Sequence, residues 1–169
     1  MEAILRDPAQ ASQPVFSRID RADRVRLSAP ALRTFRNIAD QWQLTESERL
    51  ALLGEPARST YYAWLKKADQ GKSLALALDM LLRISGVLGI FKALRILFPI
   101  AEQAAAWFNS PHAGTVFHGM SPREVIVQGG LDGILTVRRY LDAWRGGLFE
   151  HAGVGVDLAP IDETDLVFS

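Results

Sequence analysis

Apolar residues recur every three or four positions along most of the chain, which is the spacing of amphipathic α-helices. The first such run covers residues 30–43 and follows Ser28 and Pro30, a capping residue and an early proline that indicate a helix start. Residues 1–27 have few periodic apolar positions, and we expect them to form a flexible arm. No convincing period-two strand pattern precedes the C-terminal tail, so the predicted fold class is all-α.

Two short helices are predicted after the first one. A Thr-x-x-Glu capping box at residues 45–48 opens a helix over residues 46–53, and Gly54 suits the left-handed position after its end. A turn follows, after which Ser59 or Thr60 is expected to cap a third helix.

Three short helices with a tight glycine-containing turn predict a helix-turn-helix DNA-binding unit over residues 28–72. The third helix would enter the major groove, where arginine reads guanine and hydroxyl groups contact bases or phosphates. Its candidate DNA-binding residues are Arg58, Ser59, Thr60, Tyr61, Lys66 and Lys67. The pattern leaves an alternative open, a three-helix unit without a DNA role whose lysines are a solvated face.

The most apolar part of the chain follows, over residues 73–98. We expect a helix over residues 74–83 that leads through Gly86 and Gly89 into a second apolar segment, ended by Pro99. These helices would link the two halves of the chain and either form a dimer interface or be an internal core. Charged residues argue against a membrane span. They are Asp79, Arg83, Lys92 and Arg95.

The remaining pattern predicts a small helical unit over residues 99–147. It comprises a helix over residues 102–108, an irregular loop over residues 109–120 and a helix that begins at a Ser-Pro-Arg-Glu cap. Gly129 and Gly130 are expected to break that helix, and residues 131–145 to form a last amphipathic one. An acidic tail over residues 148–169 completes the chain.

Composition narrows the function classes. The 169 residues carry 19 lysines and arginines and 19 acidic side chains, yet residues 148–169 hold five acidic residues and no lysine or arginine, so the two ends suit different partners. Cysteine is absent, which excludes disulfides and thiol nucleophiles and fits a cytoplasmic location. The histidines lack the spacing of a metal pair, and no catalytic arrangement emerges. We therefore expect no enzyme, no cofactor and no metal.

The C-terminal half resembles a known family. Its Trp107-Phe-Asn-Ser-Pro stretch, the Gly119-Met-Ser-Pro-Arg-Glu motif and the closing helix that ends at Gly146-Gly147 resemble the toxin-binding domain of Xre/MbcA/ParS antitoxins, and residues 28–72 resemble their Xre-like helix-turn-helix. The resemblance implies a homodimer that represses its own promoter at operator DNA and neutralises a RES-domain toxin, an enzyme that consumes NAD.

In such an antitoxin the C-terminal region caps the active-site cleft of the toxin. We expect the acidic tail to occupy the basic pyrophosphate pocket of the toxin as an anion mimic, ordering only on binding, although a merely solubilising tail is the alternative. The candidate toxin-binding residues are Arg123, Glu124, Arg138, Arg139, Trp144, Glu150, Asp157, Asp162, Asp165 and Phe168. Two other functions stay open: a transcriptional regulator with a C-terminal dimerisation domain, and a scaffold without a DNA role.

Overall fold

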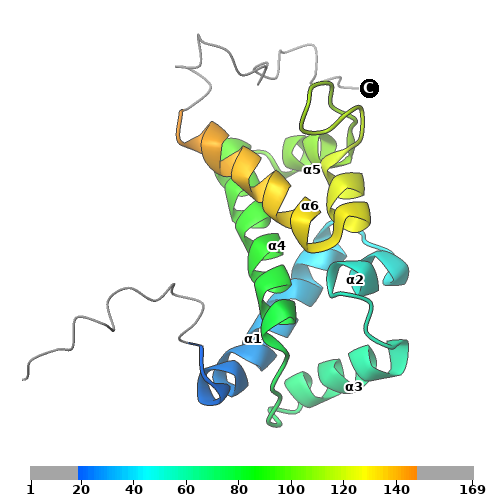
Figure 1. Cartoon of the computed structure of the whole chain (residues 1–169), viewed down its shortest axis with the longest axis vertical. Helices are drawn as coiled ribbons and strands as arrows, with labels where there is room; N and C mark the ends of the chain where they lie inside the picture. The colour runs from blue at the N-terminus through cyan, green and yellow to red at the C-terminus, as the bar shows by residue number, and fades with distance from the viewer. Residues whose placement is uncertain (1–18, 148–169) are drawn as a thin grey trace, which may run out of the picture.

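A computed structural model describes residues 19–147, and it confirms the all-α fold because these residues form helices and no strand (Figure 1). The tail residues expected to bind a toxin, and the first 18 residues of the expected arm, lie outside the described residues. The helices are α1 (Arg21–Gln41), α2 (Glu46–Leu52), α3 (Arg58–Asp69), α4 (Leu78–Leu97), α5 (Ala101–Asn109) and α6 (Pro122–Arg145).

The start of α1 differs from the prediction. The helix begins at Arg21 rather than near Pro30, so residues 21–27 are helical and not part of an arm. Asp20 is the N-cap, and its side chain accepts a hydrogen bond from the backbone N–H of Asp23 at 2.8 Å. An aspartate cap of this kind satisfies a donor at the helix end, and Pro30 is accommodated in the helix interior.

Ser28 is a tertiary contact and not a helix cap. Its side chain is fully buried, its hydroxyl donates to the carbonyl of Arg24 one turn earlier, and its oxygen accepts the backbone N–H of Leu76 at 2.9 Å. The hydroxyl thus satisfies a buried backbone donor in the extended segment before α4, which fixes that segment against α1.

The turn between α2 and α3 follows the sequence pattern in part. The capping box of α2 is present, with the Thr45 side chain and the Glu48 carboxylate each bonded to the other's backbone N–H, and Gly54 adopts a positive φ of 86°. The cap expected at Ser59 or Thr60 is wrong, because α3 begins at Arg58 and its N-cap has no side-chain hydrogen bond.

Helix α4 runs without interruption through Gly86 and Gly89. A Cβ added at Gly86 would lie 2.3 Å from Cγ2 of Ile134, and one at Gly89 would lie 2.5 Å from the Arg138 guanidinium. Both glycines therefore allow α6 to approach the backbone of α4 closely. The helix starts at Leu78, so the expected helical start at residue 74 is wrong.

Helix α6 is bent, as the glycine pair predicts. Gly130 has non-helical angles, φ 56° and ψ −136°, and divides α6 into a short and a long arm. The arms pack so closely that a Cβ on Gly133 would lie 2.2 Å from the carbonyl oxygen of Val125. The capping box expected at Ser121 and Glu124 is present, with Pro122 in the first turn.

The helices share one continuous hydrophobic core that extends from Leu32 in α1 to Leu141 in α6. Helix α4 packs against both α1 and α6, while α3 packs on α1 and α2 packs on α6. Figure 1 shows α3 at one end of the long axis and α5 with the 110–121 loop at the other. The boundaries drawn after residues 72 and 98 thus do not separate two cores and stay a prediction about function.

Candidate functional site

The N-terminal turn of α3 presents the residues expected to read DNA. Arg58 and Ser59 are exposed, and Thr60 is half-buried. The Arg58 guanidinium lies 2.9 Å from the Glu46 carboxylate and 5.8 Å from the ring centroid of Tyr62. Because the Arg58 side chain remains 71% exposed, a phosphate or base could replace Glu46 as its partner at little cost.

Tyr61 does not belong to this surface, and its predicted DNA-binding role is wrong. Its side chain is 2% exposed and lies in the core, where burial raises the pKa of its hydroxyl. The next residue, Tyr62, is 47% exposed, and its hydroxyl donates to the Glu46 carboxylate. The sequence favoured Tyr61 because it follows Thr60, but the helical rotation turns it inward.

The C-terminal turn of α3 presents the two expected lysines. Lys66 and Lys67 are both exposed, and the described residues offer neither an ion pair. Helix α1 holds this end of α3, since Arg33 donates to the carbonyl of Ala68 at 2.7 Å and Arg36 pairs with Asp69 at 2.8 Å. The Arg36 guanidinium holds the pKa of the Asp69 carboxyl below its usual value.

Arg123, expected to contact a toxin, is engaged within the chain. Its guanidinium donates to both carboxylate oxygens of Glu48, at 2.8 and 2.7 Å, and also to the Gln43 carbonyl and the Asn109 side chain. This pairing lowers the pKa of Glu48 to about 2. Glu124 is likewise occupied, as it caps its own helix at Ser121. In the free chain Arg123 therefore joins α6 to α2, and Glu124 caps α6.

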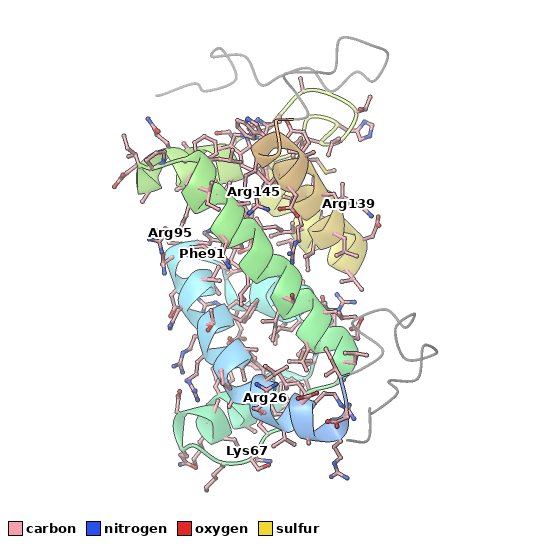
Figure 2. All side chains as sticks on the ribbon, turned by 90° about the vertical axis from the view of Figure 1, so that its left-hand side faces the viewer. Arg26, Lys67, Phe91, Arg95, Arg139 and Arg145 are labelled. Carbon is pink, nitrogen blue, oxygen red and sulfur yellow. The ribbon has the colours of Figure 1, made fainter. Side chains whose placement is uncertain are left out.

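The long arm of α6 carries three of the residues expected to bind a toxin, and their surroundings differ. Arg138 lies over Gly89, donates to the carbonyl of Ser85 at 3.0 Å and is 3.5 Å from Asp142. Arg139 is exposed, and Figure 2 shows it on the same helix as Arg145. Trp144 is half-buried.

An aromatic cluster that the sequence reasoning missed supports this end of the molecule. Its centre is Trp107, 1% exposed, whose ring stacks at 4.9 Å on the buried imidazole of His112 and lies 6.0 Å from Trp144. His112 binds the carbonyl of Trp107 through Nε2 at 2.8 Å, and Phe117 folds back onto both rings. These contacts hold the irregular 110–121 loop against α5. The aromatic residues at 107, 112 and 117 were the one sequence feature that could have indicated the cluster.

Two hollows lie on the surface near these helices. One measures about 350 Å³ and lies where the end of α4 meets the start of α5. We call it the aromatic pocket because Trp42, Phe91 and Phe98 line it. The other, of about 320 Å³, lies between the 110–121 loop and the bend of α6 and is lined in part by Val116, Met120 and Gly129. The second hollow is on the same unit as Arg139.

Between residues 19 and 147, no three histidines, cysteines or carboxylates gather where they could hold a metal ion. In that same part of the chain, no helix has the length and apolar character needed to cross a membrane.

Comparison with known proteins identifies the C-terminal half. Residues 93–147, which include α5, the loop and α6, match the family described as the antitoxin Xre/MbcA/ParS C-terminal toxin-binding domain. The chain belongs to the Xre/MbcA/ParS-type antitoxins. This antitoxin is also 40% identical over 136 residues to the protein y4oB of Sinorhizobium fredii, itself described as uncharacterized, across 80% of the chain and 99% of that relative. No solved structure matches it.

The family assignment indicates a protein that binds a toxin rather than one that catalyses a reaction. It also places the matched domain at the end of the molecule opposite α3 (Figure 1). The antitoxin therefore presents its toxin-binding domain and its exposed α3 to different sides.

Proposed function

We propose that this antitoxin neutralises a RES-domain, NAD-consuming toxin with its C-terminal end and represses its own operon through α3. The observation that carries the proposal is the match of residues 93–147 to a toxin-binding domain. The RES identity of the toxin comes from the resemblance of the motifs around Trp107 and Gly119. The spatial separation of α3 from α5 and α6 supports simultaneous use of both ends.

The toxin-facing surface of the proposal consists of the exposed part of α6, the hollow beside Val116 and the acidic tail. Arg139 is the exposed cation of the expected set, and we assign it a direct contact. Arg123 and Glu124 would support this surface through their contacts within the chain, Arg123 with Glu48 and Glu124 with Ser121. The acidic tail, with Asp162, Asp165 and Phe168 in its last part, would enter the basic pocket that binds the NAD pyrophosphate.

Co-expression tests the neutralising half of the proposal. The protein encoded beside this antitoxin should stop growth and lower cellular NAD when it is expressed alone, and the full-length antitoxin should restore both. A variant truncated after Gly147 should bind this toxin but leave NAD consumption active. Full inhibition by the truncated chain would contradict the role of the tail, and absence of a complex would contradict the proposal itself.

The DNA-binding half rests on the exposed Arg58, Ser59, Lys66 and Lys67 of α3. A fluorescence anisotropy titration with the upstream DNA of the antitoxin should show binding that weakens steeply between about 50 and 200 mM salt, because bound cations release counterions from the phosphates. Binding that is absent, or unaffected by salt, would favour a scaffold without a DNA role.

A further inference from the structure

We propose that the aromatic pocket binds a segment of the same polypeptide chain, residues 158–169, with the apolar side chains of Leu166, Val167 and Phe168 inserted into it. This inference goes beyond the proposed function, since it concerns the free antitoxin and requires neither toxin nor DNA. It replaces the expectation that the tail orders only on toxin binding, and the segment would leave this pocket when a toxin binds. Residues 158–169 lie outside the described part of the chain; the lining of the pocket, its charge and the length of the connecting chain support the placement.

The pocket has the shape and chemistry of a site for apolar side chains. Its volume of about 350 Å³ lies at the lower end of the range of about 300–1,000 Å³ typical of binding pockets. Aromatic and aliphatic side chains dominate its lining, and Trp42 is held in place by stacking on Phe108 at 4.2 Å. The lining residues are Gln41, Trp42, Phe91, Leu94, Arg95, Phe98, Pro99, Ala101, Ala104 and Ala105.

The charge of the pocket selects an acidic occupant. Arg95 lines the pocket, lies 5.8 Å from the centroid of the Phe91 ring and makes no salt bridge with residues 19–147 (Figure 2). Lys92, one residue after Phe91, is exposed as well. Residues 158–169 contain three carboxylates and no cation, and Asp165 directly precedes the apolar triplet. The segment thus combines an apolar triplet with adjacent negative charge, which complements an apolar pocket that has a cation in its lining.

The tail also starts close to the pocket. Trp144, in the last turn of α6, meets the ring of Phe98 edge-on at 5.6 Å, and Phe98 lines the pocket. From Gly147 to Leu166 the chain has 19 residues, which extend to roughly 60 Å at about 3.3 Å each. The segment can therefore reach the pocket of its own chain with a loose connection, and the tether gives it a millimolar effective concentration, in order of magnitude.

A spin label tests this placement in the full-length antitoxin. The chain has no cysteine, so Ser169→Cys provides a single attachment site, and its four tryptophans provide a small set of indole N–H signals by NMR. A nitroxide at residue 169 should reduce the indole signal of Trp42 by at least half and leave that of Trp64, in α3, unchanged. An unchanged Trp42 signal would overturn the proposal.

Two pairs of variants test whether Phe168 and Arg95 hold the segment in the pocket. Phe168→Ser should restore the Trp42 signal of the spin-labelled chain, whereas Phe149→Ser, which also lies in the tail, should not. Arg95→Glu should restore the signal, whereas Arg139→Glu, an exposed arginine outside the pocket, should leave it reduced. The reverse result in either pair would overturn the assignment of residues 166–168 and Arg95.

A mixed sample distinguishes a second copy from the chain itself. Isotope-labelled antitoxin without a spin label is mixed with unlabelled antitoxin that carries the nitroxide. The proposal predicts no loss of the Trp42 signal, because the tail occupies the pocket of its own chain. A loss in the mixed sample would show a tail exchanged between copies and would overturn the intramolecular assignment. None of these results depends on the toxin, so failure here leaves the proposed function untouched.

Discussion

Arg123 in the first turn of α6 grips the Glu48 carboxylate of α2 with two hydrogen bonds of 2.8 and 2.7 Å, although 75 residues separate them in the chain. Both side chains are less than a quarter exposed. The same carboxylate accepts the backbone N–H of Thr45, so it caps α2 and joins α2 to α6 at once. The contact fixes the toxin-binding domain against the half of the antitoxin that contains α3.

Removing Arg123 should therefore destabilise the whole chain. Arg123→Ala is expected to lower the free energy of unfolding by about 1–3 kcal/mol, because it leaves the partly buried Glu48 carboxylate without the guanidinium that donates to both its oxygens. Chemical denaturation by urea measures the change. Arg26→Ala is the matched control, since Arg26 pairs with Asp23 on the surface and should contribute no more than about 0.5 kcal/mol. Equal effects of both substitutions would contradict the structural role of Arg123.

Stability should also depend on the protonation of Glu48. Its pKa is lowered to about 2 from an ordinary value near 4.5, so its stabilising effect is present above about pH 4.5 and is lost as the pH falls toward 2. Glu124 and Asp69 act in the same direction, because their pKa values are lowered too. Urea unfolding at pH 6 and pH 3 should show a smaller loss for Glu48→Gln than for the unmodified chain.

Glu102→Gln provides the control for this pH dependence. Glu102 is exposed in α5 and makes no ion pair within the described residues, so its substitution should leave the loss of stability between pH 6 and pH 3 unchanged. If Glu48→Gln behaved like Glu102→Gln, the folded chain would not hold Glu48 as the structure shows.

The packing of the two arms of α6 depends on Gly133 far more than on Gly129. Gly133→Ala places a Cβ 2.2 Å from the Val125 carbonyl oxygen, a backbone atom that cannot move aside, and should lower the melting temperature by several degrees, equivalent to about 2–3 kcal/mol. Gly129→Ala meets nothing within 4 Å and should be neutral or stabilise by up to about 1 kcal/mol. Calorimetry of both variants checks this; a tolerated Gly133→Ala would show that the two arms of α6 are not packed as described.

Two substitutions in α3 should distinguish a loss of stability from a loss of DNA binding. Tyr61→Ala should cost about 3–5 kcal/mol of stability, because it empties a space in the core. Arg58→Ala should leave stability within about 0.5 kcal/mol and weaken binding to the upstream DNA roughly tenfold, as one good base contact is worth about 1–3 kcal/mol. Anisotropy titrations and melting curves provide both readouts, and unchanged DNA affinity in Arg58→Ala would remove α3 from the interface.

Local signals in the sequence predicted much of this architecture. Both capping boxes, at Thr45 and at Ser121, act within four residues, so their pattern suffices to locate a helix start. The bend at Gly130 was predictable for the same reason, since a glycine pair can leave the helical region locally. The all-α fold follows from these signals together with the helical spacing of apolar residues.

Contacts between distant segments escaped prediction. Glycines at 86 and 89 look like helix breakers, but they serve the close approach of Ile134 and Arg138 from α6. Ser28 looks like a cap and instead binds the backbone of Leu76. Among the candidate site residues, Arg123 was expected to contact a toxin because its motif resembles that of a toxin-binding domain, but its partner Glu48 lies in another part of the chain. Only the tertiary arrangement supplies these partners.

Hydrogen exchange on the complex with the protein encoded by the neighbouring gene would locate the toxin on the antitoxin. Toxin binding is expected to slow exchange at least tenfold in the exposed part of α6 and in residues 110–121, while α3 should exchange as in the free chain. Protection confined to α3, or no complex between the two proteins, would contradict the assignment of residues 93–147 as the surface that holds a toxin.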